Sequence, residues 1–256
     1  MAADAIQSQS ASAAMAPAIR IAGLSHQIGD RKVLDRIELE IPDARFVVLL
    51  GQNGAGKTTL FSLITRLYAA QSGSIDVFGN DIRRHPSAAL AMMGIVFQQR
   101  ALDLELTAGQ NLSYHAALHG LSLAETRRRI ADELTRVGLL SEAKRKARSF
   151  SGGEMRRLEI ARALLHQPRL LLCDEATVGL DIRSRTDILA DVRQLVRDRR
   201  IAVLWATHLI DEVAPDDVTI ILHRGHILKV GEAAAITREL GAASLAEAFR
   251  RLTEAA

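Results

Sequence analysis

An apolar run at Phe46–Leu50 leads directly into a glycine-rich segment, and this junction constrains the fold more than any other part of the chain. The segment reads Gly51-Gln52-Asn53-Gly54-Ala55-Gly56-Lys57-Thr58-Thr59 and has the pattern of a phosphate-binding loop. Such a loop joins a strand to a helix, whose free backbone N–H groups and positive dipole end face an anion. We therefore expect Lys57 to reach the β- and γ-phosphates of a nucleotide and Thr58 to offer its hydroxyl to Mg²⁺.

The composition is that of a soluble globular protein that can bury a sizeable core, with 256 residues, 48% hydrophobic and 25% charged. The net charge is only +3, so nucleic acid is not an expected partner. One cysteine, Cys173, excludes an internal disulfide and a multi-cysteine metal site. No apolar run approaches the roughly 18 to 20 residues that cross a bilayer, so we expect no membrane span. Residues 1–18, rich in Ala, Ser and Gln, are predicted to be a disordered tail.

Two further apolar runs end in residues that carry chemistry. Leu170–Cys173 precedes Asp174 and Glu175, and residues 201–207 precede His208. Continuous apolar runs are typical of parallel strands that are covered on both faces. Ligands of open α/β sheets bind at the carboxyl ends of such strands. We therefore interpret the adjacent carboxylates as a metal-and-base pair beside the phosphate loop, in preference to a turn or a helix start.

Strand signals disappear from about residue 103 to residue 165, which indicates a helical insert. Its expected helices are Ala108–Leu118, Leu123–Val137 and Met155–Leu165. The last of these is opened by Ser151-Gly152-Gly153-Glu154. Ser with Glu three residues later is the pattern of a capping box. Paired glycines would also let backbone N–H groups approach a ligand at a helix N-terminus, and the motif alone does not decide between the two interpretations.

The ordered set of these motifs resembles the ATP-binding cassette (ABC) ATPases over residues 20 to about 230. The set comprises the phosphate loop, Gln98 after the strand signal at Met93–Phe97, Ser151–Glu154, Leu170–Glu175, Val178–Asp181 and His208. The ending near Ala246–Thr253 resembles the daunorubicin-type exporter subfamily. The segments at Gln98-Gln99, Ala176–Asp181 and Trp205–Glu212 look like cassettes associated with pyrroloquinoline-quinone-dependent alcohol oxidation systems.

The resemblance implies an α/β fold, a phosphate-loop NTPase core with an antiparallel β edge subdomain and a helical subdomain at about 103–165. The nucleotide-binding domain would cover residues 19–231, and residues 232–256 would form a helical extension. The family works as a dimer, here a homodimer, with ATP between the phosphate loop of one copy and Ser151–Glu154 of the other. This favours the ligand-binding interpretation of the signature, although Glu154 stands where glutamine is usual.

Roles in catalysis also follow from the resemblance. Asp174 would hold Mg²⁺ through water, and Glu175 would polarise the attacking water. His208 would contact the γ-phosphate, Gln98 would link Mg²⁺ and this water to the membrane partner, and Asp181 would tie the two sites together. These roles serve positioning and charge stabilisation more than covalent catalysis.

One departure from the family pattern concerns the nucleotide base. Ile28 stands at what resembles the position of the aromatic ring that stacks on adenine. Residues 1–45 contain no Phe, Trp or Tyr that could replace the ring. We therefore expect weak contacts to the base and poor discrimination between ATP and GTP.

The sequence thus predicts the ATP-binding and ATP-hydrolysing subunit of a membrane transporter, an exporter by resemblance. A separately encoded membrane-spanning subunit would hold it at the cytoplasmic face of the cell membrane. One alternative is a soluble ABC ATPase that acts in translation or DNA maintenance. Another is a nucleotide-dependent regulatory module, against which the presence of Glu175 and His208 argues.

Overall fold

The computed structural model describes residues 16–255, so most of the expected tail at 1–18 lies outside the described residues. Ala18 is fully buried, and its carbonyl accepts a hydrogen bond of 3.1 Å from the backbone N–H of Phe78. The packed part of the chain therefore includes the residue just before Ile19.

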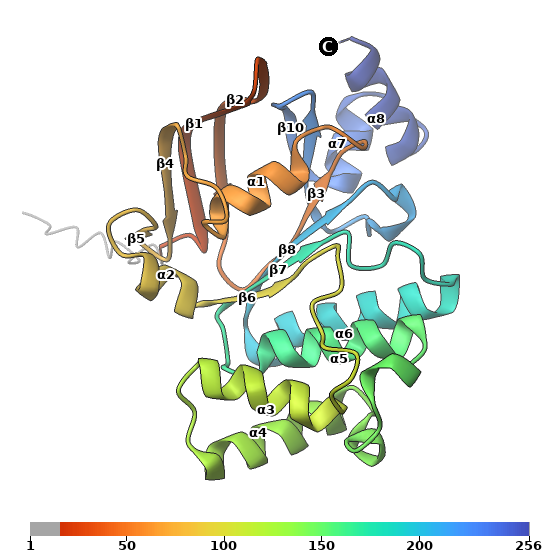
Figure 1. Ribbon diagram of the computed structural model, residues 1–256. Coiled ribbons are helices and arrows are strands. Elements are labelled where there is room, and N and C mark those ends of the chain that lie inside the picture. The colour runs from red at the N-terminus through yellow and green to blue at the C-terminus, as the bar shows by residue number, and fades with distance from the viewer. Residues whose placement is uncertain (1–15, 256) are drawn as a thin grey trace, which may run out of the picture.

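A mostly parallel sheet forms the centre of the molecule (Figure 1). Its strands are β3 (Phe46–Leu50), β6 (Met93–Val96), β7 (Leu170–Asp174), β8 (Ala202–Thr207), β9 (Val218–His223) and β10 (His226–Glu232). They lie in the order β10-β9-β3-β8-β7-β6, and only β10 runs antiparallel to its neighbour within this described sheet. The carboxyl ends of β3, β8, β7 and β6 consequently share one edge.

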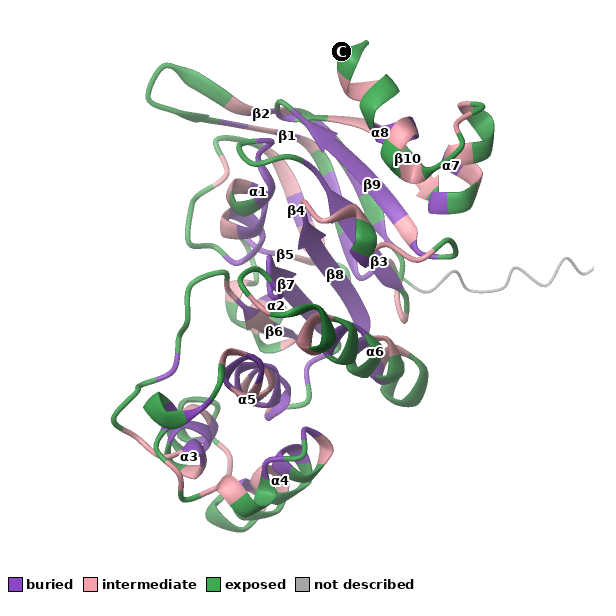
Figure 2. Ribbon diagram, turned by 90° about the vertical axis from the view of Figure 1, so that its right-hand side faces the viewer, coloured by how far each residue is buried: buried purple, intermediate pink, exposed green. Residues whose placement is uncertain are grey.

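The middle strands are buried on both faces, as their apolar runs predict (Figure 2). Alternate residues of β3 enter different cores: Val47 and Leu49 pack into one cluster, and Val48 and Leu50 into the other. Burial of apolar surface stabilises a fold by roughly 25 cal/mol per Å², so both faces of these strands contribute to stability. This two-sided burial fixes the register of the strands whose ends carry the polar residues.

An antiparallel sheet and helix α1 (Lys57–Ile64) contribute to the first cluster. The sheet consists of β1 (Ile19–Ile28), β2 (Arg31–Ile41), β4 (Ser72–Val77) and β5 (Asn80–Asp81), in the order β2-β1-β4-β5. The short helix α2 (Pro86–Ala91) follows it. The fold class predicted from the sequence is confirmed, with an α/β phosphate-loop core, an antiparallel edge sheet and a helical lobe.

The helical lobe lies below the sheet in Figure 1 and has its own core. It comprises α3 (Ala108–Leu118), α4 (Leu123–Arg136), α5 (Gly152–Leu164) and the 3₁₀ turns η1 (Leu140–Glu142) and η2 (Ala147–Ser149). Leu112, Leu134 and Leu158 meet in this core. Helix α5 begins three residues earlier than the expected Met155, because Ser151 serves as its N-cap.

The second face of the core sheet is covered by further helices. These are α5, α6 (Ile182–Arg199), α7 (Ala233–Glu239) and α8 (Leu245–Glu254), and the 3₁₀ turn η3 (Ile210–Glu212) follows β8. Ile188, Ile236 and Phe249 anchor α6, α7 and α8 in the second cluster. Within residues 16–255, no helix combines the length and the apolar character that crossing a bilayer requires.

Candidate functional site

The glycine-rich loop starts where β3 ends, and Lys57 is the first residue of α1. The ammonium of Lys57 is only 4% exposed and donates to the carbonyls of Gly51, at 2.7 Å, and Gln52, at 3.2 Å. Gly56 caps the helix with φ +112°, and a Cβ there would lie 2.8 Å from Leu34. Glycine is therefore required at this position, and the predicted strand, loop and helix are all present.

Three side chains converge on the carboxylate of Glu175. The Lys57 ammonium lies 3.1 Å from Oε1, and Nδ1 of His208 lies 3.1 Å from the same oxygen. The amide of Gln98 donates to Oε2 at 3.2 Å. His208 and Gln98 follow the ends of β8 and β6, Lys57 begins α1 after the loop that follows β3, and Glu175 directly follows β7. The structure thus brings together four of the residues that the sequence had singled out.

The charge state of Glu175 follows from these contacts. Burial alone would raise its pKa, but the hydrogen bonds from His208 and Lys57 outweigh burial and hold the pKa below its usual value. Glu175 also has φ +49°, in the left-handed region that non-glycine residues rarely adopt. Its backbone N–H donates to the Ala206 carbonyl at 3.0 Å, which ties the turn to β8. An ionised carboxylate is therefore fixed at the end of β7.

Asp174 has the environment of a metal ligand. It is 2% exposed, and its Oδ1 has no hydrogen-bond partner among the described residues. Burial raises its pKa, while the Thr58 side chain and the Lys57 charge act in the opposite direction. A buried carboxylate oxygen beside a hydroxyl group is the oxygen donor set that Mg²⁺ prefers, so the residues present fit this ion.

A cavity of about 490 Å³ opens over the loop and the Glu175 cluster. Its walls include Ile28, which is half exposed at the end of β1, and they also include the predicted residues Asn53, Gly54, Gly56, Lys57, Thr58, Thr59, Gln98, Glu175 and His208. Arg31 and Val33 line the cavity too and were not predicted from the sequence, as does Val178, which belongs to the motif Val178–Asp181 but had been assigned no role. Arg31 pairs directly across the hairpin from Ile28, so its position could have been deduced once Ile28 was placed.

The signature residues and Asp181 do not line this cavity. The Ser151 backbone N–H donates to Glu154 at 2.8 Å, and the Glu154 N–H donates to the Ser151 hydroxyl at 3.2 Å. Arg145 also donates to Glu154, at 2.6 Å. Asp181 caps α6 by accepting from the Ser184 N–H at 2.9 Å. Within one chain these residues act as helix caps, so the capping-box interpretation of Ser151–Glu154 holds at this level.

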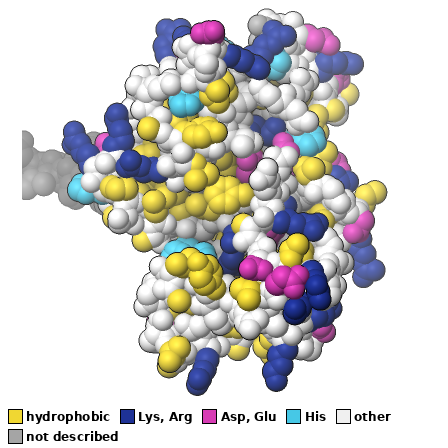
Figure 3. Space-filling model, in the orientation of Figure 1, with side chains coloured by type: hydrophobic (Ala, Val, Ile, Leu, Met, Phe, Trp, Pro, Cys, Tyr) yellow, Lys and Arg dark blue, Asp and Glu magenta, His cyan; other side chains and the backbone are white. Residues whose placement is uncertain are grey.

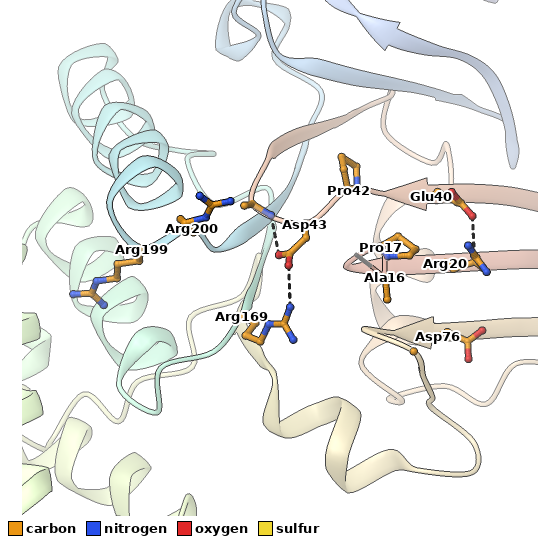
Figure 4. A pocket seen from close by; sticks show the side chains of 12 residues that line it. Ala16, Pro17, Arg20, Glu40, Pro42, Asp43, Asp76, Arg169, Arg199 and Arg200 are labelled. Carbon is orange, nitrogen blue, oxygen red and sulfur yellow. Dashed lines mark hydrogen bonds and ion pairs between the residues drawn. The ribbon is translucent and has the colours of Figure 1, made fainter. Parts of the chain in front are cut away.

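A larger cavity of about 1130 Å³ lies away from this chemistry (Figure 4). Its charged residues largely pair with one another: Arg169 donates to Asp43 at 2.9 Å, and Arg20 donates to Glu40 at 2.7 Å. No residue of the phosphate loop is among the residues that line it. The smaller cavity is therefore the candidate active site.

Comparison with known proteins agrees with this geometry. The model of the protein family described as "ABC transporter" matches residues 34–178, which is more than half of the chain. The match runs from β2 to just beyond Glu175. The chain belongs to the ABC transporter family. As an ATPase subunit of this family it binds and hydrolyses ATP, and the phosphate loop and Glu175 lie in the matched segment.

Curated relatives of this ABC ATPase differ in their transport roles. The linearmycin resistance ATP-binding protein LnrL of Bacillus subtilis is 37% identical over 214 residues, which is 83% of this chain and 68% of LnrL. The daunorubicin resistance ATP-binding protein DrrA3 of Streptomyces coeruleorubidus is 34% identical, covering 88% of this chain and 71% of DrrA3. The Fe(3+) ions import ATP-binding protein FbpC of Escherichia coli O157:H7 is 32% identical, covering 83% of this chain and 61% of FbpC.

A solved structure supports the same assignment. It is described as an ATP binding subunit of an ABC transporter and superposes with a TM-score of 0.81 at 28% identity. The match covers 92% of this chain and 99% of that chain. The resemblance to cassettes of alcohol oxidation systems is not tested by these relatives and stays a prediction.

The exposed aliphatic wall of the cavity leads to a prediction on nucleotide binding. Ile28→Tyr should tighten ATP binding roughly tenfold, because stacking of a base on an aromatic ring contributes about 1–3 kcal/mol. The maximal hydrolysis rate should not change, since Ile28 is not among the groups that contact Glu175. Titration with ATP and GTP measures the effect, and Ile28→Leu is the matched aliphatic control. Equal affinities in all three proteins would remove Ile28 from the base site.

Proposed function

We propose that the protein uses ATP to drive a membrane exporter, as a homodimer that sandwiches two nucleotides. The observation that carries this proposal is the convergence of Lys57, His208 and Gln98 on the Glu175 carboxylate. A cation for phosphate, an ionised base and two groups that orient it are the parts that phosphoryl transfer to water requires.

Each residue would contribute to a stage of hydrolysis. The loop amides and Lys57 hold the β- and γ-phosphates, so Lys57 exchanges its contact with Glu175 for one with phosphate. Glu175 then accepts a hydrogen bond from the attacking water, and His208 contacts the γ-phosphate. Asp174, Thr58 and Gln98 are the residues that would hold Mg²⁺ or its water shell, and the ion would neutralise charge that develops on the phosphate oxygens.

The position of the signature supports the proposed dimer. Ser151–Glu154 begins α5, where backbone N–H groups and the helix dipole favour an anion, but these residues are absent from the walls of their own chain's cavity. A second copy could bring its signature to the nucleotide in this cavity. Asp181, at the start of α6, would then link the two sites. This arrangement gives Ser151–Glu154 two roles, a cap within the chain and an anion contact between chains.

Export is the favoured direction because the relatives LnrL and DrrA3 are named for resistance to linearmycin and daunorubicin, and each is more similar to this chain than FbpC, which is named for import. We infer a separately encoded membrane-spanning partner and a location at the cytoplasmic face of the membrane. Another subunit structure similar to this chain is described as part of the transporter complex cbiONQ.

Affinity purification of the tagged protein from native membranes tests the proposed function. We expect a hydrophobic multi-span protein to copurify in a stoichiometric amount. We also expect the rate of ATP hydrolysis by the complex to differ from that of the isolated subunit. Recovery of ribosomes or DNA in its place would instead support the soluble alternatives, in translation or DNA maintenance.

The sandwich leads to a separate prediction. Gly153→Asp should leave ATP binding nearly unchanged and suppress hydrolysis, because its carboxylate would face the γ-phosphate held by the other copy. Gly153→Ala is the control for steric effects. Any Cβ at this position lies 2.7 Å from the Ser184 hydroxyl, so both variants share this close contact and only the aspartate adds a charge. Mixing Gly153→Asp with Lys57→Ala pairs one intact loop with one intact signature, so part of the hydrolysis should return. Loss of ATP binding in Gly153→Asp but not in Gly153→Ala would contradict the sandwich.

A further inference from the structure

A cluster of histidines lies outside the nucleotide site, where the helical lobe meets the core sheet. His115 lies in the last turn of α3, His119 is the C-cap residue of that helix, and His166 follows the end of α5. One ring nitrogen from each lies within 4.8 Å of the others. The space-filling view shows histidine side chains gathered on the molecular surface at this junction (Figure 3).

The hydrogen bond of His166 leaves one nitrogen of its ring with a free lone pair. Its Nε2 lies 2.9 Å from the carbonyl oxygen of Met93, and a carbonyl only accepts, so Nε2 must carry the hydrogen. In the neutral ring Nδ1 is then unprotonated, and this atom is buried without a partner among the described residues. A backbone carbonyl that fixes the tautomer in this way is the usual support of a metal-ligating histidine.

His115 provides a second candidate ligand nitrogen. Its Nε2 is buried and also has no partner among residues 16–255. Burial lowers the pKa of His115 to about 3 and that of His166 to about 4, so both rings are neutral at physiological pH and can act as ligands. Unpaired buried polar atoms are costly, which calls for an explanation of why two occur together.

We propose that His115, His119 and His166 bind a transition-metal cation, with Zn²⁺ as the fitting ion and water as the fourth ligand. A tetrahedral site with Zn–N bonds of 2.0–2.1 Å places its nitrogens about 3.3 Å apart, so nitrogens that lie within 4.8 Å of one another need to approach by up to about 1.5 Å. His119 is exposed and can rotate, although its ring stacks on that of His166 at 3.9 Å between centroids.

Neighbouring charges set the strength of this site. The positive charge of Arg162 contributes to the low pKa of His115, and that of Arg129 contributes to the low pKa of His166. Hydrogen bonds hold both guanidinium groups in place: Arg162 donates to the Ala101 carbonyl at 2.9 Å, and Arg129 donates to the Leu165 carbonyl at 3.0 Å. Because these positive charges repel a cation, we expect weaker binding than at a four-ligand structural zinc site.

The site would join parts of the chain that are far apart in sequence. His115 and His119 belong to the helical lobe, whereas His166 is bonded to Met93, at the start of β6. A bound ion would therefore hold α3 against the core sheet. Since α3 packs on α5, which begins with the signature, the ion would also restrict movement of the lobe that carries Ser151–Glu154.

Titration of the metal-free, nucleotide-free full chain with Zn²⁺ and with Co²⁺ as a spectroscopic probe tests this proposal. We expect one ion per chain, a visible d–d absorption band from Co²⁺ that Zn²⁺ abolishes, and a melting temperature about 5–10 °C higher at a hundredfold excess of Zn²⁺ over Kd. His119→Gln should weaken Zn²⁺ binding about a hundredfold and remove the band. This variant is suitable because the His119 side chain is exposed, so its substitution leaves the buried core intact and removes only the stacking on His166.

His226→Gln is the matched control, because His226 is exposed in β10 and far from the cluster in sequence. It should bind Zn²⁺ as the parent does. His115→Gln serves as a second ligand variant with the same expected loss. Equal Zn²⁺ binding by the parent and His119→Gln, or no saturation of the parent below about 0.1 mM Zn²⁺, would overturn the proposal.

Discussion

The buried ion pair between Lys57 and Glu175 is the interaction on which the site depends. Their side chains are 4% and 7% exposed, and the two charged groups lie 3.1 Å apart. Removing such charges from water is costly unless each is fully satisfied, and here backbone carbonyls and two further polar side chains supply the remaining contacts. When a triphosphate binds, the Lys57 ammonium can exchange the Glu175 carboxylate for a phosphate group, so it remains paired with an anion.

The parallel sheet explains why these groups meet. Side chains from four strands reach one edge because β3, β8, β7 and β6 are adjacent and point the same way. Burial on both faces leaves the register no freedom, since a shift by one residue would exchange the two cores. The helical lobe has a separate core, and its helix α5 also packs against the sheet through Ile160, Ala163 and Leu164. The proposed histidine site lies where the lobe and the sheet join.

Sequence reasoning predicted the parts that local pattern determines. The phosphate loop, the strand that ends in Asp174 and Glu175, and the strand that ends at His208 could be located because continuous apolar runs mark their strands. Arg31 was missed because its role depends on the hairpin register with Ile28. The histidine cluster was missed because His166 is distant in sequence from His115 and His119. The signature could not be assigned one role, because its contacts within the chain are those of a cap and its other expected contacts need a second chain.

In the proposed ATP-sandwich enzyme Glu175 is the base that activates water, and the variant Glu175→Gln removes this base. Glutamine keeps the shape, and its one carbonyl oxygen can still accept the hydrogen bond from His208, but it cannot take a proton from water. ATP affinity should stay close to that of the parent, single-turnover hydrolysis should fall about a hundredfold or more, and with ATP and Mg²⁺ the protein should sediment as a dimer. Hydrolysis at the parental rate would show that Glu175 is not the base and that another residue activates the water.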